Sequence, residues 1–234
     1  MLLLGRDAKR LANTSQAAQD KGAMVWQRQI SVTDQDVMTD ALTEFNEVFP
    51  IGTVILAAGV KTGNKSGVEA PEQMSRIVKV NLQATMMNTQ SALHLLRKNG
   101  GGQIVLFSSI AARAPQADLL SYSATIAGIR AYGFALRKAL AGTGISVTVV
   151  SPGFVDTPMT DRHDGPTPMK MSAQRAAKII AKGLKRRKSE LIFPRALAVS
   201  VTLKSLLPVW LDDWIDARLS ANIIPDPDEK AERQ

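Results

Sequence analysis

The sequence predicts an α/β protein: a doubly wound, parallel β-sheet of the Rossmann type, covered by helices on both faces as a three-layer sandwich. Short apolar runs with β character alternate with longer segments of helical periodicity almost from end to end, which is typical of this class. The chain has 234 residues, of which 45% are apolar, and this suffices for a well-buried core. We therefore expect one main domain.

Six short segments, mostly bounded by Gly, Ser or Pro, are predicted to be strands. They are Leu2–Leu4, Met24–Trp26, Thr53–Ala57, Gln103–Phe107, Ile145–Val150 and Glu190–Phe193. The third, fourth and fifth are apolar at nearly every position, as expected for parallel strands that are buried on both faces.

Five longer segments place apolar residues at helical spacing and are predicted to be helices. They are Asp7–Lys21, Asp34–Phe49, Pro71–Lys98, Asp118–Ala141 and Ser172–Lys188. Because strand and helix alternate over residues 1–193, we predict that this part forms one Rossmann-like domain. An apolar and basic helical extension is expected over residues 194–224 and a flexible tail over 225–234, where Pro, Asp and Glu gather.

The composition excludes several kinds of site. The absence of Cys excludes disulfides, thiolate nucleophiles and metal sites built on Cys, and it fits a reducing compartment. The two histidines, His94 and His163, are too few for a multi-histidine metal site, so we predict no metal. We interpret His163, which stands among charged residues, as solvated. No apolar run is long enough for a signal peptide or a membrane span, and we predict a cytoplasmic protein.

The net charge of +8 is concentrated in one segment. Residues 170–204 hold ten Lys or Arg and one acidic residue, which indicates either a solvated helix face or a surface that meets an anionic partner. For the basic and apolar residues 185–219, three interpretations stay open: contact with an anionic membrane, a homo-oligomer interface, or a cap over a substrate pocket. Because no recognition motif for nucleic acids is present, we predict no nucleic-acid partner.

In a sheet of this kind, ligands bind beyond the carboxyl ends of the strands. The residues that follow the predicted strands are therefore the candidate site. They are Gly5 and Arg6 after the first strand, Ala58 and Gly59 after the third, Ser109 after the fourth, and Pro152, Gly153, Val155 and Thr157 after the fifth.

These segments, in this order, resemble the short-chain dehydrogenase/reductase family. Val80-Asn81-Leu82 is similar to the segment that holds the catalytic Asn of the family. Ser109 and Tyr122, which are thirteen positions apart, match the spacing of its catalytic Ser and Tyr. The run 55–60 resembles its Asn-Asn-Ala-Gly strand with both Asn replaced, and Pro152-Gly153 with Thr157 resembles the loop that closes on the nicotinamide. The resemblance covers about residues 2–193.

The resemblance implies hydride transfer between NADP(H) and a small carbonyl or alcohol substrate. In this view Tyr122 donates the proton, Ser109 polarises the carbonyl and Asn81 supports a proton relay, because the developing oxyanion needs positioned donors. Arg6 implies NADP(H) rather than NAD(H), since a guanidinium binds a 2′-phosphate well. The other expected cofactor contacts are Gly5, Ala58, Gly59, Pro152, Gly153, Val155 and Thr157.

Position 126 departs from the family pattern. In the family, a Lys four residues after the Tyr lies one helical turn away and lowers the Tyr pKa, whereas this sequence has Ile126. Arg130, one turn further on, either leans back to take over that role or is not involved. We therefore expect an impaired oxidoreductase. The alternative is a catalytically inactive binding or scaffolding protein of the same fold, with or without peripheral membrane attachment.

The second departure concerns the first strand and the glycine-rich turn of the family. That turn places backbone N–H groups on the cofactor pyrophosphate, and no such glycine pattern occurs near the start of this sequence. The strand would lie between Leu2–Leu4 and Thr53–Ala57, so we expect a sheet that lacks it and a weakened cofactor site. Either the product begins upstream, which we favour, or the sheet is rearranged, or another chain fills the place.

Overall fold

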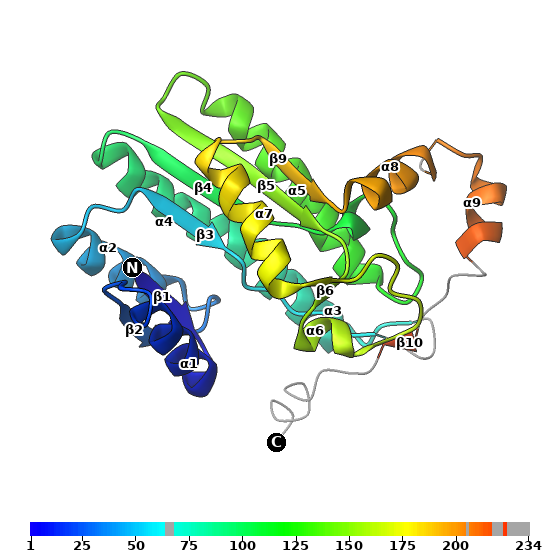
Figure 1. The fold of residues 1–234 in the computed structure, drawn as a ribbon, viewed down its shortest axis with the longest axis horizontal. Coiled ribbons are helices and arrows are strands. Elements are labelled where there is room, and N and C mark those ends of the chain that lie inside the picture. The colour runs from blue at the N-terminus through cyan, green and yellow to red at the C-terminus, as the bar shows by residue number, and fades with distance from the viewer. Residues whose placement is uncertain (64–67, 205, 217–221, 224–234) are drawn as a thin grey trace.

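The structure, a computed structural model, describes residues 1–63, 68–204, 206–216 and 222–223 of the chain. Parallel strands run through the middle of the molecule, and helices pack on both sides of them (Figure 1). This arrangement confirms the predicted α/β class.

The first part of the chain alternates strands and helices in the predicted order. Its elements are β1 (Leu2–Gly5), α1 (Ala8–Gln19), β2 (Trp26–Gln29), α2 (Gln35–Val48), β3 (Thr53–Leu56), α3 (Pro71–Ile77), the π-helical turn η1 (Val78–Gln83) and α4 (Ala84–Lys98). Carboxylates cap the first two helices: Asp7 accepts a hydrogen bond from Arg10 N at 2.9 Å, and Asp34 accepts one from Val37 N at 3.4 Å. Such caps satisfy N–H groups that the helix itself leaves unpaired.

The second part adds the remaining strands of the main sheet and a C-terminal pair of helices. Its elements are β4 (Gly102–Phe107), the 3₁₀ turn η2 (Ile110–Ala112), α5 (Leu120–Ala139), β5 (Ile145–Pro152), β6 (Val155–Asp156), α6 (Pro158–Asp161), β7 (His163–Asp164), β8 (Met171–Ser172), α7 (Ala173–Lys185), β9 (Glu190–Phe193), α8 (Arg195–Lys204), α9 (Val209–Asp216) and β10 (Asn222–Ile223).

The parallel strands of four or more residues form two separate sheets. β3, β4, β5 and β9 are hydrogen-bonded in that order as a four-stranded parallel sheet, whereas β1 and β2 form a two-stranded parallel sheet of their own. β1 and β3 therefore each have an edge without a strand partner in the described part of the chain. The three explanations given above for the absence of a strand here, namely an upstream start, a rearranged sheet or another chain, stay predictions. The division of the chain into domains at residue 193 also stays a prediction.

The main core lies where α4 and α5 pack on β4 and β5. Leu96, Ile104, Leu106 and Ile129 are at most 2% exposed, and together with their neighbours they form the largest cluster of buried side chains. Gly133 permits the close approach of α5 to β5, because a Cβ at this position would lie 2.5 Å from Cγ2 of Val149.

Some expectations about the elements are wrong in detail. The second strand begins at Trp26 rather than Met24, where the Trp26 ring packs edge-on against Phe45 with 5.5 Å between centroids. The third strand is not buried on both faces, since Ile55 is 53% exposed beside the free edge of β3. The helix predicted over residues 71–98 is interrupted by the π-helical turn η1, a feature often found at functional sites.

The C-terminal segment, for which a helical extension was expected, is helical over most of its described residues. Residues 195–219 contain two helices, α8 and α9, separated by a turn before Pro208, because Pro cannot continue a helix. Both project from the body of the molecule, at the right of Figure 1. None of the helices in the described ranges is long and apolar enough to cross a membrane. The predicted tail at 225–234 lies outside the described residues.

Candidate active site

Ser109 and Tyr122 come together at the carboxyl edge of the main sheet. Ser109 follows β4 and caps η2, where its Oγ accepts a hydrogen bond from Ala111 N at 3.2 Å and donates to the Pro152 carbonyl at 3.4 Å. Its side chain also hydrogen-bonds to Tyr122, which lies in the first turn of α5. The spacing of thirteen residues thus brings two hydroxyl groups to one point.

The surroundings of Tyr122 favour its protonated form. Burial raises the pKa of the Tyr122 phenol above its ordinary value, because the phenolate loses hydration, and the hydrogen bond with the Ser109 side chain opposes this only in part. Among the described residues, no cation contributes to the pKa of Tyr122. The hydroxyl is therefore suited to donate a proton and poorly suited to accept one near neutrality.

Glu69, which the sequence analysis missed, holds the start of α5. Its two carboxylate oxygens accept hydrogen bonds from Ser121 N at 3.1 Å each, and Ser121 Oγ also donates to it. A carboxylate at a helix N-terminus satisfies unpaired N–H groups and complements the helix dipole. Glu69 stands just before Pro71, far in sequence from α5, so no local pattern indicated this contact. The contact positions the turn that carries Tyr122.

Asn81 lies in η1 and is 1% exposed. Its side chain pairs with the backbone of Val60: Oδ1 accepts from Val60 N at 2.8 Å, and Nδ2 donates to Val60 O at 2.9 Å. Nδ2 is also 3.4 Å from Thr125 Oγ1 on α5. Asn81 thereby ties the loop after β3 to α5.

Ile126 is part of the main apolar core and is 5% exposed. The one-turn neighbour of Tyr122 therefore contributes packing and no charge. Arg130 does not replace the missing cation, because its Nε is 3.1 Å from Glu190 Oε1 and its guanidinium lies 4.8 Å above the Phe134 ring. These contacts favour the alternative in which Arg130 does not take over the role of the family Lys.

The residues after β1 and β3 form one rim of the candidate site. Gly5 ends β1, and the carbonyl of Arg6 accepts a hydrogen bond from Gln29 Nε2 at 2.9 Å. Ala58 and Gly59 are exposed, and a Cβ on Gly59 would lie 3.5 Å from Asn81 Oδ1. Small residues here leave the backbone accessible to a ligand.

The residues after β5 form the opposite rim. Pro152 accepts the hydrogen bond from Ser109, and Gly153 lies against α8, since a Cβ there would be 3.0 Å from Leu197. Val155 pairs with Met171 between β6 and β8, and Thr157 Oγ1 is 3.3 Å from the Val155 carbonyl. This loop is thus held at its start by Ser109 and α8, and further along by its pairing with β8.

A buried basic group stands beside these rims. Burial, helped by the charge of Arg162, lowers the pKa of Lys61 to about 8. His163 is 9% exposed, and its ring lies 5.0 Å from that of Phe154. Burial and the charge of Lys61 lower the pKa of His163. The prediction that His163 is solvated is therefore wrong. Lys61 was missed, although it stands two residues after Gly59 at a strand end.

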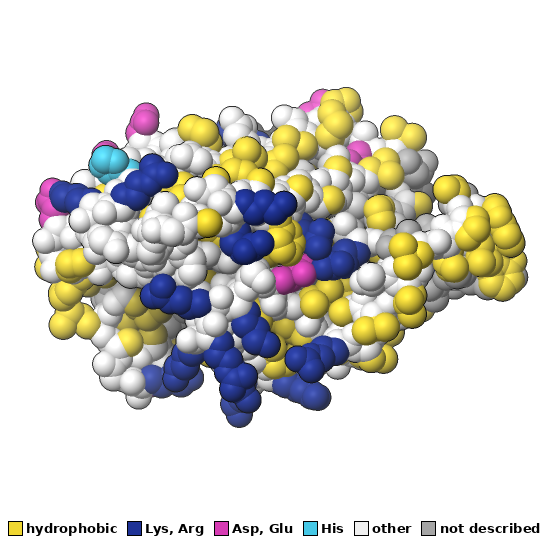
Figure 2. All heavy atoms as spheres, turned by 90° about the horizontal axis from the view of Figure 1, so that it is seen from above, with side chains coloured by type: hydrophobic (Ala, Val, Ile, Leu, Met, Phe, Trp, Pro, Cys, Tyr) yellow, Lys and Arg dark blue, Asp and Glu magenta, His cyan; other side chains and the backbone are white. Residues whose placement is uncertain are grey.

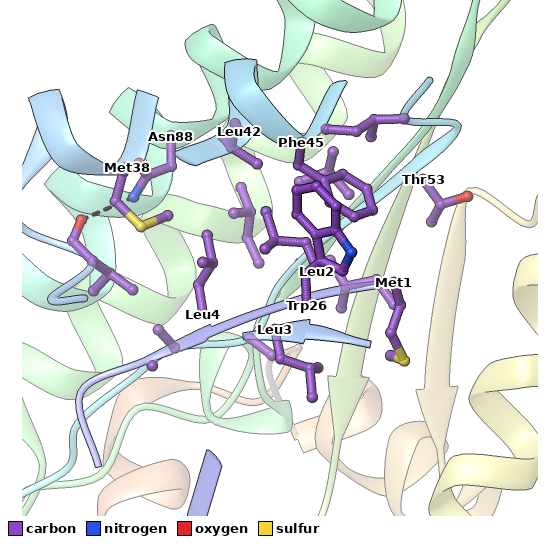
Figure 3. A pocket seen from close by; sticks show the side chains of 18 of the residues that line it. Met1, Leu2, Leu3, Leu4, Trp26, Met38, Leu42, Phe45, Thr53 and Asn88 are labelled. Carbon is purple, nitrogen blue, oxygen red and sulfur yellow. Dashed lines mark hydrogen bonds between the residues drawn. The ribbon is translucent and has the colours of Figure 1, made fainter. Parts of the chain in front are cut away.

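A largely apolar pocket of about 940 Å³ separates the two sheets. Leu2 and Leu4 of β1 point toward Met38, Leu42 and Phe45 of α2 across it, whereas Leu3 points to the other side of its strand (Figure 3). Gly5 and Ala58 are the two expected cofactor residues that line it. Among the described residues, no group of three or more His, Asp or Glu side chains is placed to hold a metal.

Comparison with known proteins identifies the relatives of this chain. The family model described as short chain dehydrogenase matches residues 1–166. An uncharacterised oxidoreductase of Staphylococcus epidermidis is 32% identical over 185 residues, which is 79% of this chain and 79% of the relative. An uncharacterised oxidoreductase of Myxococcus xanthus is 29% identical over 217 residues, which is 92% of this chain and 85% of the relative.

Solved structures share the fold. A variant of actinorhodin polyketide ketoreductase, crystallised with NADPH, superposes with a TM-score of 0.75 at 22% identity, over 84% of this chain and 87% of the other. A ketone-specific alcohol dehydrogenase from Comamonas testosteroni gives a TM-score of 0.71 at 21% identity, over 93% and 81%. With the family match and the relatives, these findings show that the chain belongs to the short-chain dehydrogenase/reductase family of oxidoreductases, which bind nicotinamide cofactors.

Proposed function

We propose that this chain is an NADP(H)-dependent reductase of small carbonyl compounds, in which Ser109 and Tyr122 bind and protonate the carbonyl oxygen. The hydrogen bond between these two side chains, at the carboxyl edge of the sheet, carries the proposal. Reduction of a carbonyl places negative charge on its oxygen, and two positioned hydroxyl donors stabilise that charge.

The cofactor, when bound, supplies the hydride. The small, exposed residues Ala58 and Gly59 and the loop residues Pro152, Gly153, Val155 and Thr157 would border its nicotinamide end. Gly5 and Arg6 would meet its adenosine end, where the guanidinium favours a 2′-phosphate. The residues named here offer contacts only to these two ends of the cofactor. The N-terminus of α1 is already occupied by Asp7, and no glycine-rich turn follows a strand there.

The electrostatics of Tyr122 favour reduction over oxidation. Reduction requires the protonated phenol, which the raised pKa maintains, whereas alcohol oxidation requires the phenolate as a base. The proton moves from Tyr122 Oη to the substrate oxygen while Ser109 Oγ donates a hydrogen bond to that oxygen. Asn81 acts at a distance by holding the loop after β3.

The test is oxidation of NADPH with a panel of small ketones and aldehydes. We expect Tyr122→Phe to lower kcat by about 100-fold or more, the usual contribution of a positioned proton donor, and Ser109→Ala to act in the same direction. Tyr132→Phe is the matched control, because Tyr132 lies on the same helix and hydrogen-bonds to Gln90 instead. Equal losses in both Tyr variants, or none in Tyr122→Phe, would refute these roles.

A binding or scaffolding protein without redox activity is the second candidate. Ile126 favours this candidate, because an apolar side chain packed in the core stands where the family has a Lys. NADPH binding followed by its fluorescence, together with no turnover of any carbonyl by excess protein, would favour this candidate. Turnover that depends on Tyr122 would eliminate it.

Peripheral membrane attachment is a further candidate property of this protein. The apolar side chains of Leu206, Val209 and Trp210 are each more than 70% exposed. In Figure 2, hydrophobic side chains cover the projection at the right, and Lys and Arg side chains gather over the neighbouring body. Co-sedimentation with anionic vesicles, lost in a Trp210→Ser and Trp214→Ser double variant, would support attachment. Equal sedimentation with neutral and anionic vesicles, or no sedimentation with either, would reject membrane attachment.

A further inference from the structure

We propose that Lys61 forms, together with Arg162 and His163, a binding site for a carboxylate, and that the carbonyl substrates of this chain are oxo acids. This inference rests on the proposed function, because it assigns a class of substrate to the same site. It adds a group that holds one end of the substrate while Ser109 and Tyr122 act on the other end.

The loop that carries Lys61 is tied to the turn that carries Tyr122. Lys61 directly follows Val60, whose backbone N–H and carbonyl pair with the Asn81 side chain at 2.8 and 2.9 Å. Asn81 Nδ2 is 3.4 Å from Thr125 Oγ1, which donates a hydrogen bond to the Tyr122 carbonyl at 2.9 Å. These contacts hold the loop of Lys61 near the first turn of α5, at the carboxyl end of β3.

The other two basic side chains come from the segment that follows β5. Arg162 follows α6, and His163 begins β7. The parallel strands β3 and β5 end at the same edge of the main sheet, where α3, α6 and β6 also lie (Figure 1). The charge of Arg162 acts on Lys61, and the charge of Lys61 acts on His163. Basic groups from two strand ends therefore meet at one place.

Lys61 is a buried cation to which the described part of the chain offers no counter-ion. It is 7% exposed, and among the described residues its side chain makes no ion pair or hydrogen bond. The Nδ1 atom of His163 is also buried and has no hydrogen-bond partner there. A buried charge without a partner costs free energy, and the lowered pKa of Lys61 reflects this cost. A bound anion would offset it.

The carboxylates of this region do not supply that anion. Asp118 and Asp164 raise the pKa of His163, but each of these effects is smaller than the lowering by burial or by Lys61. Neither of them contributes to the pKa of Lys61. In the described part of the chain, the charge that acts on Lys61 is that of Arg162, and two cations at one place attract an anion from outside.

A carboxylate fits these groups better than a phosphate. Near neutral pH the Lys61 ammonium supplies a positive charge and N–H donors, and His163, whose pKa is lowered, supplies one N–H as a neutral imidazole. Such donors suit the two oxygens and the single charge of a carboxylate. Phosphates are typically bound by the N-termini of helices and by the planar fork of Arg. We therefore expect a substrate with a carboxylate.

The charge of Lys61 is not used by Tyr122. Burial and the hydrogen bond with Ser109 are the causes that act on the pKa of Tyr122, so Lys61 does not replace the Lys that the family has at position 126. Its effect should be on the affinity for the substrate rather than on proton transfer. The oxo acid would place its carbonyl oxygen at Ser109 and Tyr122 and its carboxylate at Lys61.

The experiment compares oxo acids with their neutral amides. The acids 2-oxobutanoate, 4-oxopentanoate and 5-oxohexanoate are titrated calorimetrically into the full chain, both alone and with NADP⁺, so that no reduction occurs. The primary amide of the acid that binds most tightly keeps the ketone and lacks the charge. We expect this acid to bind at least about tenfold more tightly than its amide, as the loss of a charge-assisted hydrogen bond implies.

Three variants assign this preference to Lys61. Lys61→Met should weaken binding of the acid by about tenfold or more and leave the affinity for the amide unchanged, whereas Lys61→Arg keeps the charge and should retain a preference for the acid. Lys178→Met removes a charge at an exposed position of α7 and should change neither affinity. With NADPH, Lys61→Met should raise the KM for the acid and leave kcat within about twofold, because it removes binding alone.

The outcomes separate this proposal from the proposed function. Equal binding of acid and amide to the native chain, or binding of neither, would overturn the carboxylate site. So would a preference for the acid that persists in Lys61→Met or that Lys178→Met also removes. Reduction of neutral ketones that depends on Tyr122, without a preference for acids, would support the reductase and refute the carboxylate site. A preference for acids that depends on Lys61, without oxidation of NADPH, would support the carboxylate site and refute the reductase.

Discussion

Tyr122 is the residue whose protonation state decides in which direction the proposed site works. Burial raises the pKa of Tyr122 in the folded chain. Near neutral pH its phenol is therefore protonated, whether a carbonyl or an alcohol is the substrate. Reduction uses that proton, whereas oxidation must first remove it.

The first prediction is therefore a difference between two pH profiles. Reduction of a carbonyl by NADPH should be nearly constant between about pH 6 and 9, since Tyr122 stays protonated there. Oxidation of the corresponding alcohol should still rise at about pH 10, the ordinary pKa of a phenol. Steady-state rates in both directions provide the measurement. An oxidation rate that levels off near pH 7 would mean that an unrecognised cation lowers the Tyr122 pKa.

The second prediction concerns Ile126. Ile126→Lys should lower the free energy of unfolding by about 3 kcal/mol, because it places an unpaired charge among apolar side chains. Ile126→Met, an apolar change of similar size, should cost less than about 1.5 kcal/mol. Urea denaturation compares the two variants. Equal stability would mean that position 126 opens toward solvent or toward Tyr122, and the core assignment would be wrong.

The third prediction concerns Lys61, whose pKa is lowered to about 8 in the folded chain from an ordinary 10.5. Between these values the unfolded chain binds a proton that the folded chain lacks, so stability should rise with pH across this window. Lys61→Met should raise the melting temperature at pH 7 and abolish that rise. Melting curves from pH 7 to 10.5 test it, and Lys178→Met, at an exposed position of α7, is the control. A fall with pH that Lys61→Met removes would reverse the sign of our argument.

At the scale of single residues, the spacing of thirteen positions between Ser109 and Tyr122 indicated this pair from the sequence. The structure places the two side chains in contact. Glu69 and Lys61 were missed, because a contact across fifty residues and a pKa set by burial leave no local pattern. His163 was misread for the same reason: its ring is buried beside Phe154 and near the charge of Lys61, which is far away in sequence.

At the scale of the elements, positions were predicted well wherever hydrophobic periodicity was strong. Glu190–Phe193 was predicted exactly, and the predicted bounds of α2 and α5 lie within two residues of those observed. The π-helical turn η1 was not predicted, because one extra residue in a helical turn scarcely changes the apolar spacing. That turn nevertheless carries Asn81 to the backbone of Val60.

The fourth prediction tests the packing of α5 on β5. Gly133→Ala should destabilise the chain by about 1–3 kcal/mol, because the added Cβ would lie 2.5 Å from Val149 Cγ2 in a well-packed core. Gly52→Ala is the matched control, since no atom lies within 4 Å of its added Cβ and its backbone is not in the left-handed region. Denaturant unfolding of both variants gives the comparison. A neutral Gly133→Ala would mean that α5 lies further from the sheet than described.

At the scale of the whole molecule, the division into two sheets is the main departure from a continuous parallel sheet. The fold class and the order of elements along the chain followed from the alternation of strands and helices, but pairing between strands far apart in sequence depends on which edges meet in three dimensions. Two-stranded sheets are weak by themselves, so β1 and β2 depend on α2 and on the apolar wall of the pocket for their stability.

The fifth prediction is a difference in stability between the two sheets of one molecule. Amide exchange at Leu3 and Gly5 should be at least about 100-fold faster than at Val105 and Val149, which are at most 1% exposed and belong to the four-stranded sheet. Native-state hydrogen exchange measures this directly. Equal protection would mean that the two sheets unfold as one cooperative unit.

The central claim is that Tyr122 and Ser109 serve a carbonyl reductase, and a single-turnover isotope transfer tests it most directly. Excess protein is mixed with NADPH that carries deuterium at C4 of the nicotinamide and with a ketone, and the alcohol is analysed by mass spectrometry. The account predicts an alcohol with deuterium on the former carbonyl carbon, formed by the native chain and by Tyr132→Phe and lost in Tyr122→Phe. Bound NADPH without labelled alcohol, or labelled alcohol formed equally by Tyr122→Phe, would contradict it.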